Sequence, residues 1–219
     1  MSPVQRRALG TRARLLEAGR AAFSQYGHDG ANLTTDILEP AGVSVGSFYH
    51  QFADKTELLI AILDEAAIQR KASVLFRGQE DGKRPAFEAD VADAIERLFV
   101  SLDDEAHVWR IQVRERINPD PRIRQRILDG RHAWQQEVAR FLARHNRCDD
   151  DALAQAVEMI IIFCIGLVAA YLDLPLEVRS ARRPTLPPQV SEFLCNGVRP
   201  VLGISPPRKS GQSALGDAK

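Results

Sequence analysis

The chain of 219 residues has no net charge, few aromatic residues and only three cysteines. Lys and Arg together number 29, Asp and Glu also number 29, and aromatic residues make up 6% of the sequence. Zero net charge argues at first sight against a nucleic-acid partner, because phosphate contacts need cations. The apolar content of 45% nevertheless suffices for a buried core at this length, and it excludes a wholly disordered chain.

The cysteines Cys148, Cys164 and Cys195 form neither a disulfide framework nor a CxxC metal motif. This usage indicates a reducing compartment. Oxidant sensing by Cys148 or Cys195 remains a minor alternative, whereas Cys164 lies in an apolar run and is expected to be inert.

Long apolar runs are also lacking. The longest, Met159 to Ala170, is shorter than the roughly 18 residues that span a bilayer, so we expect it to form a buried helix. Met1 to Gly10 carries arginines without an apolar run, so no signal peptide is expected. We therefore expect a soluble, cytoplasmic protein with no membrane partner.

The motifs of common enzyme classes are missing too. The sequence contains no HExxH and no glycine-rich phosphate loop. Asp129 and His132 resemble half of a helical metal motif, but such sites need two His-containing units and further carboxylates. We expect no catalytic residue, no metal site and no cofactor.

Apolar residues recur at helical spacing almost throughout, and no segment alternates with the period of a strand, so the chain is predicted to be all-α. Gly27 is expected to end the first helix, and Asp54 with Glu57 to cap a later one. The first helix presents an apolar stripe of Leu15, Leu16, Gly19, Ala22, Phe23 and Tyr26. Further helices are predicted over Phe87–Leu102, Ala106–Ile117, Arg122–Arg144, Asp151–Leu172 and Gln189–Leu202.

The segment Leu33 to Leu59 predicts two short helices that cross at a tight glycine turn, a helix-turn-helix. Ser44 is a good N-cap for the second helix, which begins at Val45. Four apolar residues are spaced to face inward: Ile37, Ala41, Val43 and Phe48. The outward residues are small or hydrogen-bonding groups that can approach base edges and phosphates: Val45, Gly46, Ser47, Tyr49 and His50.

This segment resembles the TetR family of transcriptional regulators over roughly residues 10–65. The resemblance is carried by Thr34, Ile37, Leu38, Ala41, Gly42, Val43, Ser44, Gly46, Ser47, Phe48, Tyr49, His50, Phe52, Lys55 and Leu58. It implies a DNA-binding site made of Thr34, Thr35, Ser44, Val45, Gly46, Ser47, Tyr49, His50 and Lys55. In that site Thr34 or Thr35 offers a hydroxyl and a backbone N–H to phosphate, and Lys55 contacts phosphate from the other side.

Two residues depart from the family pattern. Val45 stands where Lys or Pro is frequent, and it cannot donate a hydrogen bond to a base. Pro40 stands where Ala is usual, and its missing N–H predicts a kinked or very short first helix in the motif.

The resemblance further implies two domains: a helix-turn-helix DNA-binding domain at 1–55 and a helical effector-binding and dimerisation domain at 56–202. The tail at 203–219 lacks the apolar residues to join a core, so we expect it to be disordered. The partners are then a double-stranded DNA operator, a small-molecule effector and a second copy of the chain, and repression is the usual outcome. The expected lining of the effector pocket is Phe99, Trp109, Gln112, Trp134, Met159 and Phe163, with Arg110 or His132 as further polar anchors. The expected dimer interface draws on Ile160, Phe163, Leu167, Ala170, Tyr171, Phe193, Val198 and Val201.

Local charge changes the meaning of the zero balance. The first fourteen residues hold four arginines and no acid, which favours a basic N-terminal arm: Arg6, Arg7, Arg12 and Arg14. A second arginine run is either a solvated helix face or part of a site for an anionic effector: Arg110, Arg114, Arg116, Arg122, Arg124, Arg126 and Arg131. The alternative to a regulator is a helical binding protein or enzyme with an incidental helix-turn-helix hairpin.

Overall fold

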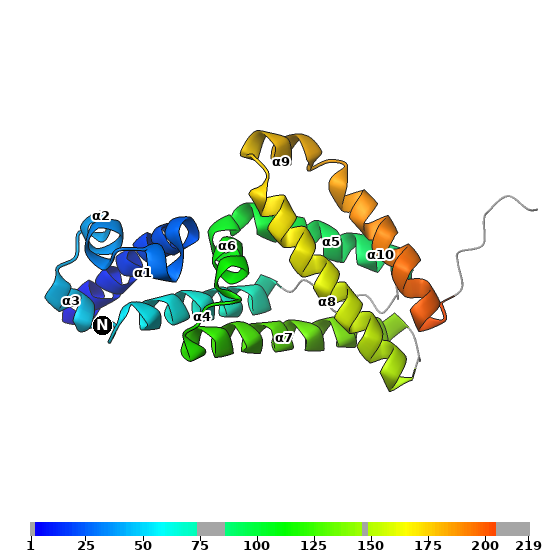
Figure 1. Cartoon of the computed structure of the whole chain (residues 1–219), viewed down its shortest axis with the longest axis horizontal. Helices are drawn as coiled ribbons and strands as arrows, with labels where there is room; N and C mark the ends of the chain where they lie inside the picture. Colours follow the sequence, from blue (N-terminus) through cyan, green and yellow to red (C-terminus); the bar gives the residue numbers. More distant parts are fainter. Residues whose placement is uncertain (1–2, 74–85, 146–148, 205–219) are drawn as a thin grey trace, which may run out of the picture.

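The computed structural model is helical throughout the residues that it describes, which are 3–73, 86–145 and 149–204 (Figure 1). The all-α prediction is therefore confirmed for this part of the chain. In chain order the elements are α1 Pro3–Gly30, η1 Leu33–Leu38, α2 Glu39–Ala41, α3 Val45–Tyr49, α4 Lys55–Ser73, α5 Phe87–Asp104, α6 Ala106–Glu115, α7 Pro121–His145, α8 Asp150–Asp173, α9 Leu176–Arg182 and α10 Leu186–Leu202. The tail predicted to be disordered lies, after Ile204, outside the described residues.

The five long helices predicted for the C-terminal part are confirmed within a few residues at each end. The seven-residue helix α9 was not predicted, because so short a segment shows little periodicity. Helix α10 begins earlier than predicted, since Pro187 and Pro188 lie in its first turn. A missing backbone N–H costs nothing there, because those donors have no partner within a helix.

Two hydrophobic clusters organise the molecule. The first joins α1, the short helices η1 to α3 and the first half of α4, and it also takes in Ile111 of α6 and Ile123 of α7. The second is built from α5, α6, α7, α8 and α10, with α10 packed along α5. Figure 1 shows the short helices at one end of an elongated molecule and α8 and α10 towards the other, with α4 and α7 running side by side between them.

Helix α8 passes through the second cluster but is only partly covered. It is the one described helix that is long and apolar enough, by length and composition, to cross a membrane. Only 28% of its most apolar window is buried. The expectation of a buried helix is therefore wrong for most of this window, since the helix packs on one side against its neighbours and leaves an apolar side uncovered.

Gly27 interrupts α1 without ending it. Its backbone angles, φ 74° and ψ 175°, lie in a region that is open almost only to glycine, and one further helical turn follows to Gly30. A Cβ built on Gly27 would lie 2.9 Å from Cδ of Arg114. Tyr26, predicted to belong to the core stripe, is 47% exposed because it lies in the last turn before this break and is left half uncovered.

We predict opposite effects for alanine at two glycines of α1. Gly27→Ala should lower the free energy of unfolding by about 1–3 kcal/mol, through backbone strain and the close contact with Arg114. Gly10→Ala should raise it by about 0.5–1 kcal/mol, because Gly10 is helical and a Cβ there meets nothing within 4 Å. Urea unfolding of the two variants tests this, and equal effects would contradict the assignment of strain to Gly27.

Candidate nucleic-acid interface

A tight turn at Gly42 joins the two helices of the motif. Gly42 has φ 60° and ψ 43°, a left-handed conformation that favours glycine. Its N–H donates to the Glu39 carbonyl oxygen (3.1 Å), and the N–H of Val43 donates to the Leu38 carbonyl oxygen (3.1 Å). These paired bonds form a Schellman motif, which satisfies the carbonyls at the end of α2 and fixes where the next helix starts.

The first helix of the motif is short and irregular, as Pro40 predicted. Pro40 has no N–H to donate to Asp36, and the preceding donor, the N–H of Glu39, reaches back five residues to the Thr34 carbonyl oxygen. The segment therefore forms a wide π-type turn before α2. Side-chain burial holds it in place, since Ile37 is fully buried.

Asn32, not a threonine, is the N-cap of this segment. Its Oδ1 accepts hydrogen bonds from the N–H groups of Thr34 (2.9 Å) and Thr35 (3.2 Å). The N–H groups that were expected to meet phosphate are thus already bonded within the protein, which corrects that part of the expectation. Both threonines are exposed, and the Thr35 hydroxyl donates to Oδ1 of Asp36 (3.2 Å).

Helix α3 begins at the predicted cap. Ser44 Oγ accepts from the N–H of Ser47 (3.2 Å), and the two hydroxyls lie 2.9 Å apart. Phe48 is fully buried, with its ring 5.2 Å from that of Tyr49, so it anchors the helix to the core. The cap Ser44 is exposed, and so are all the predicted outward residues: Val45, Gly46, Ser47, Tyr49 and His50.

The N-terminal end of α3 has small side chains on its exposed side, and no other described residue covers them. A Cβ built on Gly46 meets nothing within 4 Å, and Val45 is 51% exposed. Tyr49 is 57% exposed and supplies a phenol hydroxyl one turn further on. This arrangement lets the helix approach another surface closely by its N-terminal end, which is how recognition helices enter the major groove.

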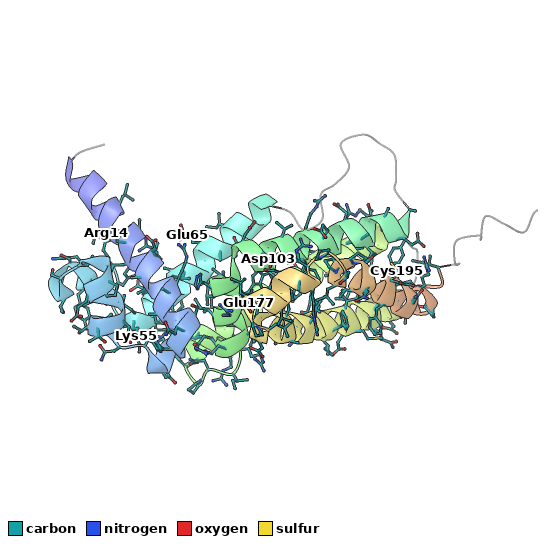
Figure 2. The ribbon with its side chains drawn as sticks, turned by 90° about the horizontal axis from the view of Figure 1, so that it is seen from above. Arg14, Lys55, Glu65, Asp103, Glu177 and Cys195 are labelled. Carbon is teal, nitrogen blue, oxygen red and sulfur yellow. The ribbon has the colours of Figure 1, made fainter. Side chains whose placement is uncertain are left out.

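Lys55 has a structural partner in addition to its predicted role. Its Nζ donates to the Ala31 carbonyl oxygen (2.7 Å), which ties the start of α4 to the loop after α1. An ammonium group has three donors, so this bond leaves capacity for another acceptor. Figure 2 shows Lys55 and Arg14 at the end of the molecule that carries the motif.

The basic N-terminal residues lie on a helix and not on an extended arm, because α1 begins at Pro3. Arg12 stacks over the Phe52 ring, 4.6 Å from its centre, and Nη1 of Arg14 lies 3.5 Å from the Gly42 carbonyl oxygen. Both arginines therefore bring positive charge onto the motif. The side chains of Arg6 and Arg7 lie outside the described residues.

Ion pairs tie the start of α4 to the turn between α6 and α7. Arg122 donates to Asp54 (2.9 Å) and to Asp120 (3.2 Å). Burial raises the pKa of Asp54, but hydrogen bonds from Arg122 and from the N–H of Glu57 outweigh it, so that pKa is lowered. The pKa of Asp120 is lowered chiefly by its hydrogen bond with Arg122.

A buried carboxylate completes this junction. Glu115, 3% exposed, accepts from the backbone N–H of His28 (2.7 Å) and from Nδ2 of Asn118 (2.5 Å). The ring nitrogen Nε2 of His28 lies 2.9 Å from the Thr56 hydroxyl, which donates to Asp120 (3.3 Å). Through these contacts the end of α1 and the start of α4 are both fastened to the α6–α7 turn.

A cavity of about 400 Å³ opens between α4, α6, α7 and α8. Three of the six residues predicted to bind an effector line it: Trp109, Gln112 and Trp134. The other lining residues are Leu63, Ala67, Val113, Arg116, Arg126, Ile127, Leu128, Gly130, Arg131, Ala133, Glu137, Ile162, Ile165 and Val168.

The remaining predicted pocket residues lie elsewhere. Phe99 is fully buried with its ring 5.0 Å from that of Tyr171, Met159 is 52% exposed, and Phe163 stacks on Phe193 at 5.1 Å. The alternative anchors are also occupied outside the cavity: Arg110 donates to the Leu172 carbonyl oxygen (3.3 Å), and His132 lies 2.9 Å from the Gln136 amide.

Sulfur and metal chemistry gain no support. Burial raises the pKa of the Cys164 thiol to about 12 and also raises the pKa of Cys195, so neither favours the reactive thiolate. Cys148 lies outside the described residues. Within the described ranges there is no group of three or more His, Cys, Asp or Glu side chains that could hold a metal ion.

The exposed helix α3 on a helix-turn-helix, joined to a helical bundle with a cavity, defines the helix-turn-helix class of DNA-binding regulators. Residues 15–62 match the family described as bacterial regulatory proteins, tetR family. The chain belongs to this TetR family, which consists of regulators and not of enzymes.

Individual relatives agree with the family. The chain is 26% identical over 138 residues to the HTH-type transcriptional repressor AcnR of Corynebacterium efficiens, a match covering 62% of this chain and 65% of AcnR. It is 28% identical over 157 residues to the repressor ComR of Escherichia coli, covering 67% of this chain and 73% of ComR. The structure of Salmonella enterica GusR shares the fold, with a TM-score of 0.66 and 16% identity over 93% of this chain and 98% of GusR.

We predict that Arg122→Gln destabilises the protein in a pH-dependent way. The lowered pKa values of Asp54 and Asp120 mean that their contribution is complete above the ordinary value of 3.8 and is lost as the pH falls through the lower folded values. The difference in unfolding free energy between wild type and variant should be constant above about pH 5 and should vanish in acid.

The matched control is Arg124→Gln. Arg124 is an exposed neighbour that donates to the Pro119 carbonyl oxygen (3.1 Å), not to a carboxylate. Chemical denaturation between pH 3 and 7 should give a pH-dependent difference for Arg122→Gln alone. If both variants showed the same pH dependence, the ion pairs of Arg122 would not be its cause.

Proposed function

We propose that the protein is a cytoplasmic transcriptional repressor that binds operator DNA as a homodimer and is released by a small-molecule effector. The observation that carries this proposal is helix α3, held by the buried Phe48 and open at Val45 and Gly46. The proposal includes a DNA-binding domain at 1–55 and an effector-binding and dimerisation domain at 56–202. Helix α4 begins at the boundary between them, and its first half packs into the core of the N-terminal helices.

In the proposed complex, α3 enters the major groove by its N-terminal end. Gly46 lets the backbone come close, and Ser47 offers a hydroxyl to a base edge or a phosphate. Val45 can contact a thymine methyl group but cannot donate a hydrogen bond. The flanking phosphates meet Tyr49, His50, the hydroxyl of Thr34 and a free donor of Lys55, with Ser44 and Thr35 at the margin.

A second copy of the chain fits the uncovered side of α8 and α10. Met159, Ile162 and Phe193 are 52%, 58% and 62% exposed, and the stacked rings of Phe163 and Phe193 join the two helices into one apolar surface. Such a surface on a single chain marks an interaction site. Two copies related by a two-fold axis would pair these helices and present two α3 helices to one face of DNA.

This surface revises the interface residues proposed from sequence. Tyr171 and Val198 are buried within the chain, and the Tyr171 hydroxyl donates to Asp103 (2.8 Å), so neither can contribute to it. Ala170 is exposed and Phe193 remains at its centre. Met159 joins the dimer surface in place of its predicted role in the effector pocket.

The effector would act through α4, which reaches from the cavity to the motif. Leu63 of α4 lines the cavity, and Arg126 of α7 contacts Asp64 and donates to the Leu63 carbonyl oxygen (3.1 Å). A ligand that favours one position of α4 would change the separation of the two α3 helices in the dimer. The ligand would release DNA if it binds more tightly to the dimer whose α3 separation does not fit the operator than to the dimer that fits it.

We predict that Gly46→Glu abolishes specific DNA binding without unfolding the protein. A side chain at Gly46 enters open space in the free protein, but in the groove it would hold the backbone away and place a carboxylate among phosphates. Fluorescence anisotropy with the DNA upstream of the protein's own gene should show affinity reduced by roughly tenfold to a hundredfold or more.

Ser180→Glu is the control for charge. Ser180 is an exposed residue of α9, and this helix lies far from α3 (Figure 1). The control variant should bind as wild type does. Wild-type affinity in Gly46→Glu would refute the docking of α3 by its N-terminal end.

We also predict that Phe193→Glu converts the dimer to a monomer. The change places a charge at the centre of the apolar surface, whereas Ile117→Glu places the same charge on an 80% exposed residue between α6 and α7. Sedimentation equilibrium should give twice the monomer mass for wild type and Ile117→Glu, and the monomer mass for Phe193→Glu. A Phe193→Glu dimer would place the interface on another surface.

A further inference from the structure

The cavity between α4, α6, α7 and α8 is apolar over most of its wall, yet it contains three arginines. Leu63, Val113, Ile127, Ile165 and Val168 are among its apolar residues. The charged residues in the wall are Arg116, Arg126, Arg131 and Glu137. A volume of about 400 Å³ lies within the range of roughly 300–1,000 Å³ that small-molecule sites occupy.

The arginines differ in how far their charge is already compensated. Arg126 forms an ion pair with Asp64, outside the cavity wall. Arg116 donates to the carbonyl oxygen of Val113, a neutral partner. Within the described part of the chain, neither Arg116 nor Arg131 forms an ion pair with a carboxylate.

Glu137 does not cancel both of these cations. It follows Arg131 by six residues on α7, which places it roughly 9 Å further along the helix axis. Two uncompensated arginines against one glutamate leave the wall with a single excess positive charge. That excess suits a ligand with one negative charge.

Arg116 lies at a different end of the cavity from the two tryptophans. On α6, Trp109 precedes Arg116 by seven residues, roughly 10.5 Å along the axis. On α7, Trp134 lies between Arg131 and Glu137, and its ring meets that of Trp109 edge-on at 6.3 Å. Arg116 is thus next to the α6–α7 turn and both indoles are further from it, whereas Arg131 lies ten residues into α7 and one helical turn before Trp134.

A second, smaller cavity continues beyond Trp134. Its volume is about 60 Å³, and its wall includes Trp134, Ile95, Leu98, Phe141 and Cys164. Every residue of this wall is apolar. Because Trp134 belongs to both walls, it is the partition between an amphipathic space and a purely apolar one.

We infer that the effector is an amphipathic monocarboxylate. Its carboxylate is held by Arg116 and Arg131, the two exposed arginines of the wall without a carboxylate partner, and its apolar end lies against Trp109 and Trp134. Guanidinium groups suit a carboxylate because they present paired donors in a planar fork. This inference names the ligand class for the effector site of the proposed function and rests on it.

The chain provides its own reporter for binding. Trp109 and Trp134 are its only two tryptophans, and both line the cavity. Decanoate, added below the concentration at which it forms micelles, should change the intrinsic fluorescence saturably. Decanol and decyltrimethylammonium should bind more weakly by roughly tenfold or more, since each lacks the charge-assisted hydrogen bonds.

Arginine variants locate the carboxylate. Arg116→Gln and Arg131→Gln should each raise the Kd for decanoate by roughly tenfold and leave the Kd for decanol unchanged. The control Arg140→Gln changes an exposed arginine of α7 that donates to the Gln136 carbonyl oxygen and does not line the cavity. Equal affinity for decanoate and decanol, or unchanged affinity in both cavity variants, would overturn the inference.

Tryptophan variants locate the apolar end. Trp134→Leu should open the way to the second cavity and shift the preferred carboxylate to a longer chain, with Trp109 as the remaining reporter. Trp109→Leu should not lengthen the preferred chain, because Trp109 does not line the second cavity. The same preferred length in wild type and Trp134→Leu would refute the proposed orientation.

DNA binding is measured separately, so that the two proposals can fail independently. If the protein binds DNA tightly but shows no preference for carboxylates, the proposed repressor function stands and the proposed ligand class is rejected. If it binds decanoate selectively but has no specific DNA site, the ligand class stands and the repressor function is rejected. Release of the bound DNA by decanoate, and not by decanol, would support both.

Discussion

Leu63 of α4 is buried in the core of the N-terminal helices and also lines the cavity of the C-terminal helices. One side chain therefore belongs to both parts of the molecule, and closely packed interiors transmit displacement instead of absorbing it. The polar junction has the same effect at the other end of α4, where Asp54 and Thr56 are bonded to the α6–α7 turn. The cavity wall and the core that holds α3 therefore share the side chain of Leu63.

Although the chain has no net charge, its arginines have different structural roles. Arg114 and Arg122 join the two parts of the chain, through the Ser24 carbonyl oxygen and through Asp54 respectively. Arg116 and Arg131 face the cavity instead. The run that looked in the sequence like a single basic face is thus split by the turn between α6 and α7, and only part of it is neutralised by carboxylates.

The parts of the fold that follow from local patterns were predictable. The Gly42 turn, the Ser44 cap and the burial of Phe48 each depend on residues within a few positions of one another. The cavity was only half predictable, because whether Trp109 or Phe99 faces it depends on how distant helices cross. Amphipathic spacing shows which side of a helix is apolar, but it does not distinguish a core, a cavity wall and a surface that a second chain covers.

The same limit explains the partners that sequence did not reveal. Asn32 caps the motif from a position that looked like a loop, and Lys55 bonds to the Ala31 carbonyl oxygen across 24 residues. Glu115 gave no signal at all, since a buried acid among arginines resembles an exposed one in sequence. The contacts of Lys55 and of Glu115 with His28 join segments that are brought together only by the tertiary fold, whereas the Asn32 cap is local and was missed because two threonines follow it.

The wide turn ahead of Pro40 affects the direction in which the residues before it point. A π-type turn contains one residue more than the α-helical turn that it replaces. One residue on a helix is a rotation of about 100°. The residues ahead of the turn, Thr34 among them, are therefore rotated by about that angle relative to a regular helix that ends at the same Gly42 turn.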